Sequence, residues 1–131
     1  MSADHLELTK KAYAAALHGS YEDFLSLLAE EVRIFLPESL PHGGSYYGKE
    51  GARQLRAKLM NAWRQFDVTV LEYLTGAETV VGIIYLQGVL SSSAKAVDMR
   101  IAEYWRFRGE KVIELRAYYF DTHAVAQAAE S

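Results

Sequence analysis

The sequence predicts an α+β fold, in which helices from the first half of the chain cover one face of a mostly antiparallel sheet. Two observations support this prediction. Up to about residue 63, apolar residues recur at the three- and four-residue spacing of helices, whereas after Gln65 they alternate with polar residues as in strands. The chain has 131 residues, 50% of them hydrophobic, and no repeat or linker. We therefore expect a single domain over residues 1–131 with its own core.

Two helices joined by a tight break are expected at the start of the chain. Asp4 and Glu7 form a pattern resembling a capping box, and Gly19 suits the left-handed end of a helix. Apolar residues at helical spacing before Trp63 indicate a third helix. The expected elements of this half are a helix over residues 4–17, a short helix after Ser20, a strand over 32–36, a loop over 38–48 and a helix over 49–63.

Four strands are expected in the second half, joined by short turns. Turn residues at Gly76 and at Gly109-Glu110 separate runs that are rich in β-branched and aromatic residues. Asp121 precedes a short terminal helix, and we interpret it as a helix cap rather than a catalytic residue. The expected strands begin near Phe66 and then cover residues 80–90, 98–107 and 112–120.

Glu103 is the one charged residue on an otherwise apolar strand face. The row that it shares consists of Met99, Ile101, Trp105 and Phe107. A buried carboxylate is costly unless it is paired or protonated, so such a residue indicates a pocket. We therefore expect Glu103 to be the acid/base residue of a small-molecule site.

The turn at Gly109-Glu110 predicts partners for this carboxylate. A two-residue hairpin places Arg116 opposite Glu103 and Tyr118 opposite Ile101, all on one face. In the predicted site, Arg116 polarises Glu103 and Tyr118 donates a hydrogen bond. The alternative is a cross-strand ion pair on a partly wet sheet.

Other aromatic and polar residues are candidates for ligand contacts. His42 and Tyr47 lie in a glycine-containing loop, where a histidine could act as an acid or base near the pocket mouth. Trp63 and Trp105 could form a pocket wall. The alternatives are a solvated loop histidine and two tryptophans that only pack in the core.

Composition excludes several other classes of function. The net charge is −3 with no basic block, so we expect no nucleic-acid partner, and no apolar run is long enough for a membrane span. There is no cysteine, and the four histidines lack metal-ligand spacing, so no metal site is expected. No glycine-rich nucleotide motif occurs, and we expect no cofactor. The N-terminal segment lacks a signal-peptide pattern, so we expect a cytoplasmic location.

Three motifs, in this order and spacing, resemble the SnoaL-like branch of the nuclear-transport-factor-2-like superfamily. They are PHGGSYYGKEG (residues 41–51), EYWRFRGEKV (103–112) and YYFDT (118–122). The resemblance implies a cone-shaped α+β barrel, with the N-terminal helices packed in a strongly curved sheet and a pocket at the wide end. It also implies a homodimer through the outer sheet face, for which we expect an interface with Arg100, Tyr104, Arg106 and Tyr119.

The resemblance implies roles for particular residues. The protonated carboxylic acid of ketosteroid isomerase falls at Glu103, its base falls at Leu36, and its oxyanion tyrosine falls near Ala12, one residue from Tyr13. Leucine cannot accept a proton, and the aspartate of limonene epoxide hydrolase falls at Tyr118. The implied function is acid/base chemistry of an isomerase, cyclase or lyase on a small apolar or polyketide-like substrate. The alternative is a non-catalytic ligand-binding or dimerisation domain.

Overall fold

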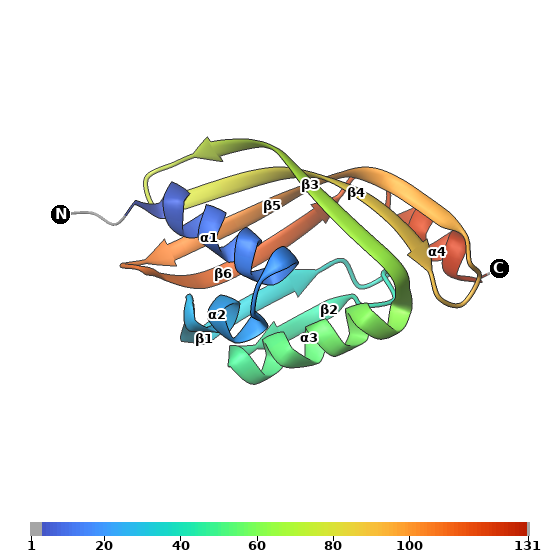
Figure 1. Ribbon diagram of the computed structural model, residues 1–131, viewed down its shortest axis with the longest axis horizontal. Helices are drawn as coiled ribbons and strands as arrows, with labels where there is room; N and C mark the ends of the chain where they lie inside the picture. Colours follow the sequence, from blue (N-terminus) through green and yellow to red (C-terminus); the bar gives the residue numbers. More distant parts are fainter. Residues whose placement is uncertain (1–3, 131) are drawn as a thin grey trace.

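The computed structural model describes residues 4–130, in which a six-stranded sheet packs against helices (Figure 1). Met1–Ala3, part of the segment considered above for a signal peptide, and Ser131 lie outside the described residues. The elements in chain order are α1 (His5–His18), α2 (Tyr21–Ser26), β1 (Leu28–Leu36), β2 (Gly44–Tyr47), α3 (Gly48–Ala62), β3 (Trp63–Thr75), β4 (Thr79–Leu90), β5 (Ala96–Arg108), β6 (Lys111–Tyr119) and α4 (Thr122–Glu130).

The sheet is mixed, curved and open. Its strand order is β2-β1-β6-β5-β4-β3, with β1 parallel to β6 and every other neighbouring pair antiparallel. Figure 1 shows α1, α2 and α3 on the concave side of this sheet. There α3 runs alongside β1 and β2, and α1 lies between β3 and β6. The predicted α+β class is confirmed. The residues enclosed between these helices and the sheet form the core.

The first turns of α1 and α4 are capped as expected, but Gly19 at the end of α1 is extended (φ −121°), so the expected left-handed helix end is wrong. The strands extend further than the sequence indicated. The Glu7 backbone N–H donates to Asp4 Oδ1 at 3.2 Å, and the Ala124 N–H donates to Asp121 Oδ1 at 3.0 Å, so both residues cap helices. The expected loop over residues 38–48 is partly wrong, because residues 44–47 form the edge strand β2. Pairing with β1 and burial of Tyr46 outweigh the glycines there.

The hairpin of β5 and β6 contains a bulge that we did not predict. Its turn has the expected two residues, with Arg108 opposite Lys111. The register then shifts between Arg106 and Phe107, because Ile113 is an extra residue in β6. Beyond the bulge, every side chain of β6 therefore points to the face opposite to the predicted one.

Two glycines on the inner face of β4 make room for aromatic side chains. A Cβ atom at Gly82 would lie 2.4 Å from the Tyr13 hydroxyl oxygen, and one at Gly88 would lie 2.6 Å from the Trp63 ring. Both distances are below any normal contact, so each glycine allows an aromatic side chain to lie directly against the sheet backbone. Tyr13 and Trp63 also take part in hydrogen-bonded clusters of polar side chains on the inner side of the sheet.

Candidate functional site

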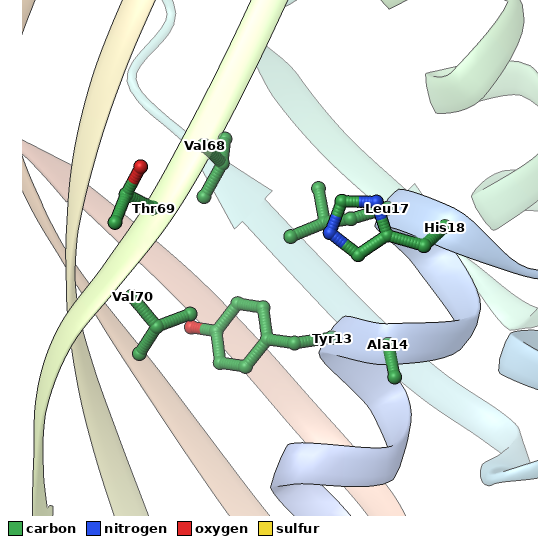
Figure 2. A pocket seen from close by; sticks show the side chains of 7 residues that line it. All are labelled: Tyr13, Ala14, Leu17, His18, Val68, Thr69 and Val70. Atoms are coloured by element: carbon green, nitrogen blue, oxygen red, sulfur yellow. The ribbon is translucent and has the colours of Figure 1, made fainter.

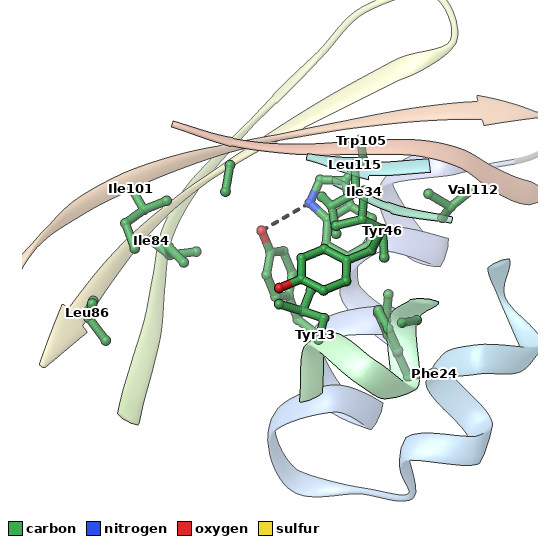
Figure 3. Packing of buried hydrophobic residues seen from close by; sticks show 14 of the residues in the cluster. Tyr13, Phe24, Ile34, Tyr46, Ile84, Leu86, Ile101, Trp105, Val112 and Leu115 are labelled. Carbon is green, nitrogen blue, oxygen red and sulfur yellow. Dashed lines mark hydrogen bonds between the residues drawn. The ribbon is translucent and has the colours of Figure 1, made fainter. Parts of the chain in front are cut away.

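Glu103 is held by a tyrosine from the first helix. The Tyr13 hydroxyl donates to Glu103 Oε1 at 2.7 Å. The Trp105 Nε1–H donates to the Tyr13 oxygen at 3.1 Å (Figure 3). Tyr13 comes from α1, whereas Glu103 and Trp105 lie two residues apart on the inner face of β5. The chain of two hydrogen bonds fixes the tyrosine hydroxyl, which in turn orients the carboxyl group.

One carboxyl oxygen of Glu103 remains available to a ligand. Among the described residues, Oε1 accepts from Tyr13 and no side chain or backbone group donates to Oε2. Within residues 4–130 no fully buried side-chain oxygen lacks a partner, so Oε2 retains access to solvent. Burial raises the pKa of Glu103 above its ordinary value, and the Tyr13 hydrogen bond offsets part of that rise. The group is thus a carboxyl with a raised pKa and one open oxygen.

An apolar hollow borders Tyr13, between α1 and β3 (Figure 2). Its volume is about 450 Å³. In Figure 2 the Tyr13 ring extends from α1 toward Val70, so the residue that holds Glu103 also borders the hollow. The residues that line it are Tyr13, Ala14, Leu17, His18, Val68, Thr69 and Val70.

A second polar group lies on the inner side of the sheet, around His42. The His42 side chain is fully buried, so the alternative of a solvated loop histidine is wrong. The Trp63 Nε1–H donates to His42 Nδ1 at 3.2 Å, and His42 Nε2 lies 2.8 Å from the Tyr119 hydroxyl oxygen. Burial lowers the pKa of His42 to about 4, so the imidazole is neutral at physiological pH.

The predicted pairing of Glu103 with Arg116 is wrong. Glu103 lies opposite Ala117, and Arg116 lies opposite Tyr104 on the outer face of the sheet. The bulge at Ile113 causes this difference, because it moves Arg116 to the other face. Arg116 therefore does not polarise Glu103.

Arg116 instead belongs to an ion-pair cluster around Glu114. Its Nε donates to Glu114 Oε2 at 2.5 Å, and Arg106 and Arg33 lie 3.0 and 3.4 Å from Oε1. Glu114 is thus the carboxylate that pairs with the arginines. Burial raises the pKa of Glu114, but Arg116 and Arg106 together outweigh it, so the pKa lies below its ordinary value.

The remaining candidates divide between the two faces of the sheet. Tyr118 is 57% exposed on the outer face, so its expected hydrogen bond beside Glu103 is wrong. Tyr119, expected on the outer interface, lies opposite Ile101 on the inner face, and that expectation is also wrong. Tyr47 is 64% exposed at the end of β2 and does not border the hollow. Trp63 and Trp105 are both buried, and each donates a hydrogen bond to a polar group of the site.

Neither a metal centre nor a membrane span is evident in the part of the chain that the structure describes. Residues 4–130 contain no cluster of three or more histidine and carboxylate side chains positioned for a metal ion. No helix among them is both long enough and apolar enough to cross a bilayer.

Comparison with known proteins identifies the fold. The SnoaL-like domain family matches residues 9–115. An NTF2-like protein of unknown function from Burkholderia pseudomallei K96243 superposes with a TM-score of 0.84 at 14% identity, over 98% of this chain and 99% of the other. No curated protein sequence matches this chain.

Two further solved structures have the same architecture. TerC, co-crystallised with polyporic acid, superposes with a TM-score of 0.86 at 20% identity, over 98% of this chain and 100% of the other. A putative SnoaL-like polyketide cyclase from Jannaschia sp. CCS1 gives 0.82 at 19% identity, over 96% and 91%. At these identities the superpositions show the fold alone. The family match covers most of the chain, which therefore belongs to the SnoaL-like domain family and has the cone-shaped α+β fold of the nuclear-transport-factor-2-like superfamily.

Proposed function

We propose that this protein binds a small, largely apolar molecule in the hollow beside Tyr13 and that Glu103 transfers a proton to or from it. The observation that carries this proposal is the Glu103 carboxyl group, which lies alone on an apolar strand face with one oxygen bonded to Tyr13 and the other open. Apolar pockets with few, well-placed polar groups are typical of small-molecule sites.

The raised pKa of Glu103 suits it to acid/base chemistry. A carboxyl group whose pKa is raised by burial is a stronger base when ionised, and it retains a proton closer to neutral pH. In the proposed reaction Glu103 Oε2 removes a proton from a carbon next to a carbonyl group and returns it to a carbon of the same molecule. The net result is isomerisation, and no atom is gained or lost.

The roles of the neighbouring residues follow from their contacts. Tyr13 positions the carboxyl group, because its own proton is donated to Glu103 Oε1. Trp105 fixes Tyr13 by donating to its oxygen. The related structures support a ligand site of this kind, since TerC was co-crystallised with polyporic acid and another relative is described as a putative polyketide cyclase.

Proton exchange into a simple ketone tests the proposal without knowledge of the natural substrate. The probe is 2-tetralone in deuterated water, with proton NMR following the loss of its C1 protons. We expect exchange above the buffer rate with the wild type, and a rate on the order of 10²-fold lower with Glu103→Gln. Glu72→Gln, at an exposed carboxylate of β3, is the matched control. Equal exchange rates for the wild type and Glu103→Gln would refute the proposed role.

A binding domain without catalysis is the second candidate. It is favoured by Leu36 at the end of β1, where the resembling isomerases carry their base and this chain carries a side chain that cannot accept a proton. Saturable binding of 2-tetralone by the wild type, with no exchange above the buffer rate, would favour this candidate.

We also propose that two copies of the chain associate through the outer face of the sheet. Tyr104 lies on this face opposite Arg116 of the Glu114 cluster, Tyr85 lies opposite Arg100, and Tyr118 is 57% exposed there. Tyrosine and arginine are enriched at protein interfaces. Of the residues expected there, Arg100, Tyr104 and Arg106 remain in the proposed interface and Tyr119 is removed from it.

A further inference from the structure

The contact between Trp63 and His42 determines which imidazole nitrogen carries the proton. An indole N–H can only donate, and it points to His42 Nδ1 at 3.2 Å, so Nδ1 must present its lone pair. A neutral imidazole then carries its proton on Nε2. The fully buried position of His42 agrees with a neutral ring.

The tautomer of His42 in turn determines the role of Tyr119. Because His42 Nε2 is protonated, it donates to the Tyr119 oxygen at 2.8 Å, and the tyrosine acts as acceptor in this bond. The hydroxyl proton of Tyr119 is donated to no other residue among 4–130. The oxygen of this hydroxyl is therefore fixed by His42, while its proton is not used in any hydrogen bond among these residues.

Tyr13 provides a direct contrast. Its oxygen also accepts a tryptophan N–H, from Trp105, but its proton is already donated to Glu103. Of Tyr13 and Tyr119, only Tyr119 thus keeps its hydroxyl proton for a ligand.

The unused donor lies close to the open carboxyl group. Glu103 lies opposite Ala117 and Tyr119 lies opposite Ile101, so Glu103 and Tyr119 are diagonal neighbours on the inner face. Side chains at such positions start about 7–8 Å apart, within reach of one small molecule that contacts both. Burial raises the pKa of Tyr119, and the charge of the nearby Glu103 raises it further.

We propose that Tyr119 is the residue that donates a hydrogen bond to an oxygen atom of the ligand, and that Trp63 and His42 are the residues that position it. The ligand class is then a small apolar molecule with an acceptor oxygen, such as a ketone or an enolate, placed between Tyr119 and Glu103. This inference rests on the proposed function, since it concerns the molecule on which Glu103 is proposed to act. In the proton transfer described above, the Tyr119 hydroxyl stabilises the negative oxygen that forms when the carbon proton leaves.

A pair of ligands that differ only in the oxygen tests this role. The probes are 2-tetralone and tetralin, which share a skeleton, and titration calorimetry gives the ratio of their affinities. We expect the wild type to favour the ketone, and Tyr119→Phe to lower that ratio about fivefold while tetralin still binds. Tyr118→Phe, next in sequence but on the outer face, should leave the ratio unchanged. An unchanged ratio in Tyr119→Phe, or a wild type that binds neither probe or both equally, would overturn the proposal.

The failure of this inference can be told apart from the failure of the proposed function. Glu103→Gln should lower the exchange rate on the order of 10²-fold yet keep the preference for the ketone, because the preference depends on Tyr119. Nitrogen-15 NMR of His42 in the wild type adds a test that needs no variant to fold. We expect a protonated Nε2 and an unprotonated Nδ1, and a protonated Nδ1 would overturn the assignment of the donor.

Discussion

Acidification should destabilise this protein through His42. The imidazole is fully buried, accepts from Trp63 and cannot take a second proton without losing that hydrogen bond. In the unfolded chain it protonates near its ordinary pKa of 6.5, whereas in the folded protein burial lowers the pKa to about 4. Between these values the unfolded state binds more protons than the folded state. Stability is therefore fully present above about pH 6.5 and is lost as the pH falls toward 4.

The size of this loss follows from the two pKa values. Each pKa unit corresponds to about 1.4 kcal/mol, so a pKa lowered from 6.5 to about 4 corresponds to about 3 kcal/mol of unfolding free energy. That is a large part of the 5–15 kcal/mol or so by which typical domains are stable. The effect should thus be measurable well before the carboxylates dominate acid unfolding.

Urea unfolding at pH 4 to 7.5, followed by tryptophan fluorescence, measures the effect against His42→Gln. Glutamine does not titrate, and its amide can both accept from Trp63 and donate to Tyr119. Other groups contribute slopes of their own, so the quantity to compare is the difference in unfolding free energy between wild type and variant. We expect the wild type to lose about 3 kcal/mol relative to the variant between pH 7 and pH 4. His123→Gln, at an exposed histidine, is the control for the number of histidines, and a difference that does not depend on pH would refute the reasoning.

Further predictions concern the other polar group, the glycines and the assembly. Glu103→Gln should stabilise the protein increasingly as the pH rises above about 4.5, because ionising a carboxyl group whose pKa is raised costs folding free energy. Urea unfolding at pH 4 and pH 8 measures this trend. The trend would be absent if Glu103 were solvated. Gly82→Ala should lower the free energy of unfolding by about 1–3 kcal/mol, since its Cβ would lie 2.4 Å from the Tyr13 oxygen. Adding Tyr13→Phe should recover part of that loss. If Gly82→Ala had the same unfolding free energy as the wild type, the tyrosine would not be held there. Light scattering of the wild type should give about twice the 14.7 kDa chain mass. Tyr104→Glu, which puts a charge on the outer face, should lower the measured mass. A wild-type mass of one chain would exclude the dimer at that concentration.

The fold was predictable because its signals are local and repeated. Helix caps such as Asp4 and the alternation of apolar residues along β4 and β5 each depend on a few neighbouring residues. The same signals correctly identified Glu103 as an inward-facing carboxyl group. What failed was the position of β6 relative to β5, because a bulge adds one residue and reverses all later side chains.

A trace of the bulge is present in the sequence. Val112 is buried on the inner face, and the inward row then continues at Leu115, Ala117 and Tyr119 instead of at residue 114. The change from even to odd positions marks the extra residue, and following it would have placed Tyr119 inside and Arg116 outside. The contact between His42 and Tyr119 joins residues 77 positions apart, and no local pattern predicts it.

Titration of the Glu103 carboxyl carbon by carbon-13 NMR tests the central claim most directly. The carboxyl group should titrate above the ordinary glutamate pKa of 4.5, because burial outweighs the hydrogen bond from Tyr13. In Tyr13→Phe the pKa of Glu103 should rise further, since the donor that favours the charged form is lost. A Glu103 that titrates as it does in a free peptide, and does not respond to Tyr13→Phe, would contradict the existence of an enclosed acid/base group at this position.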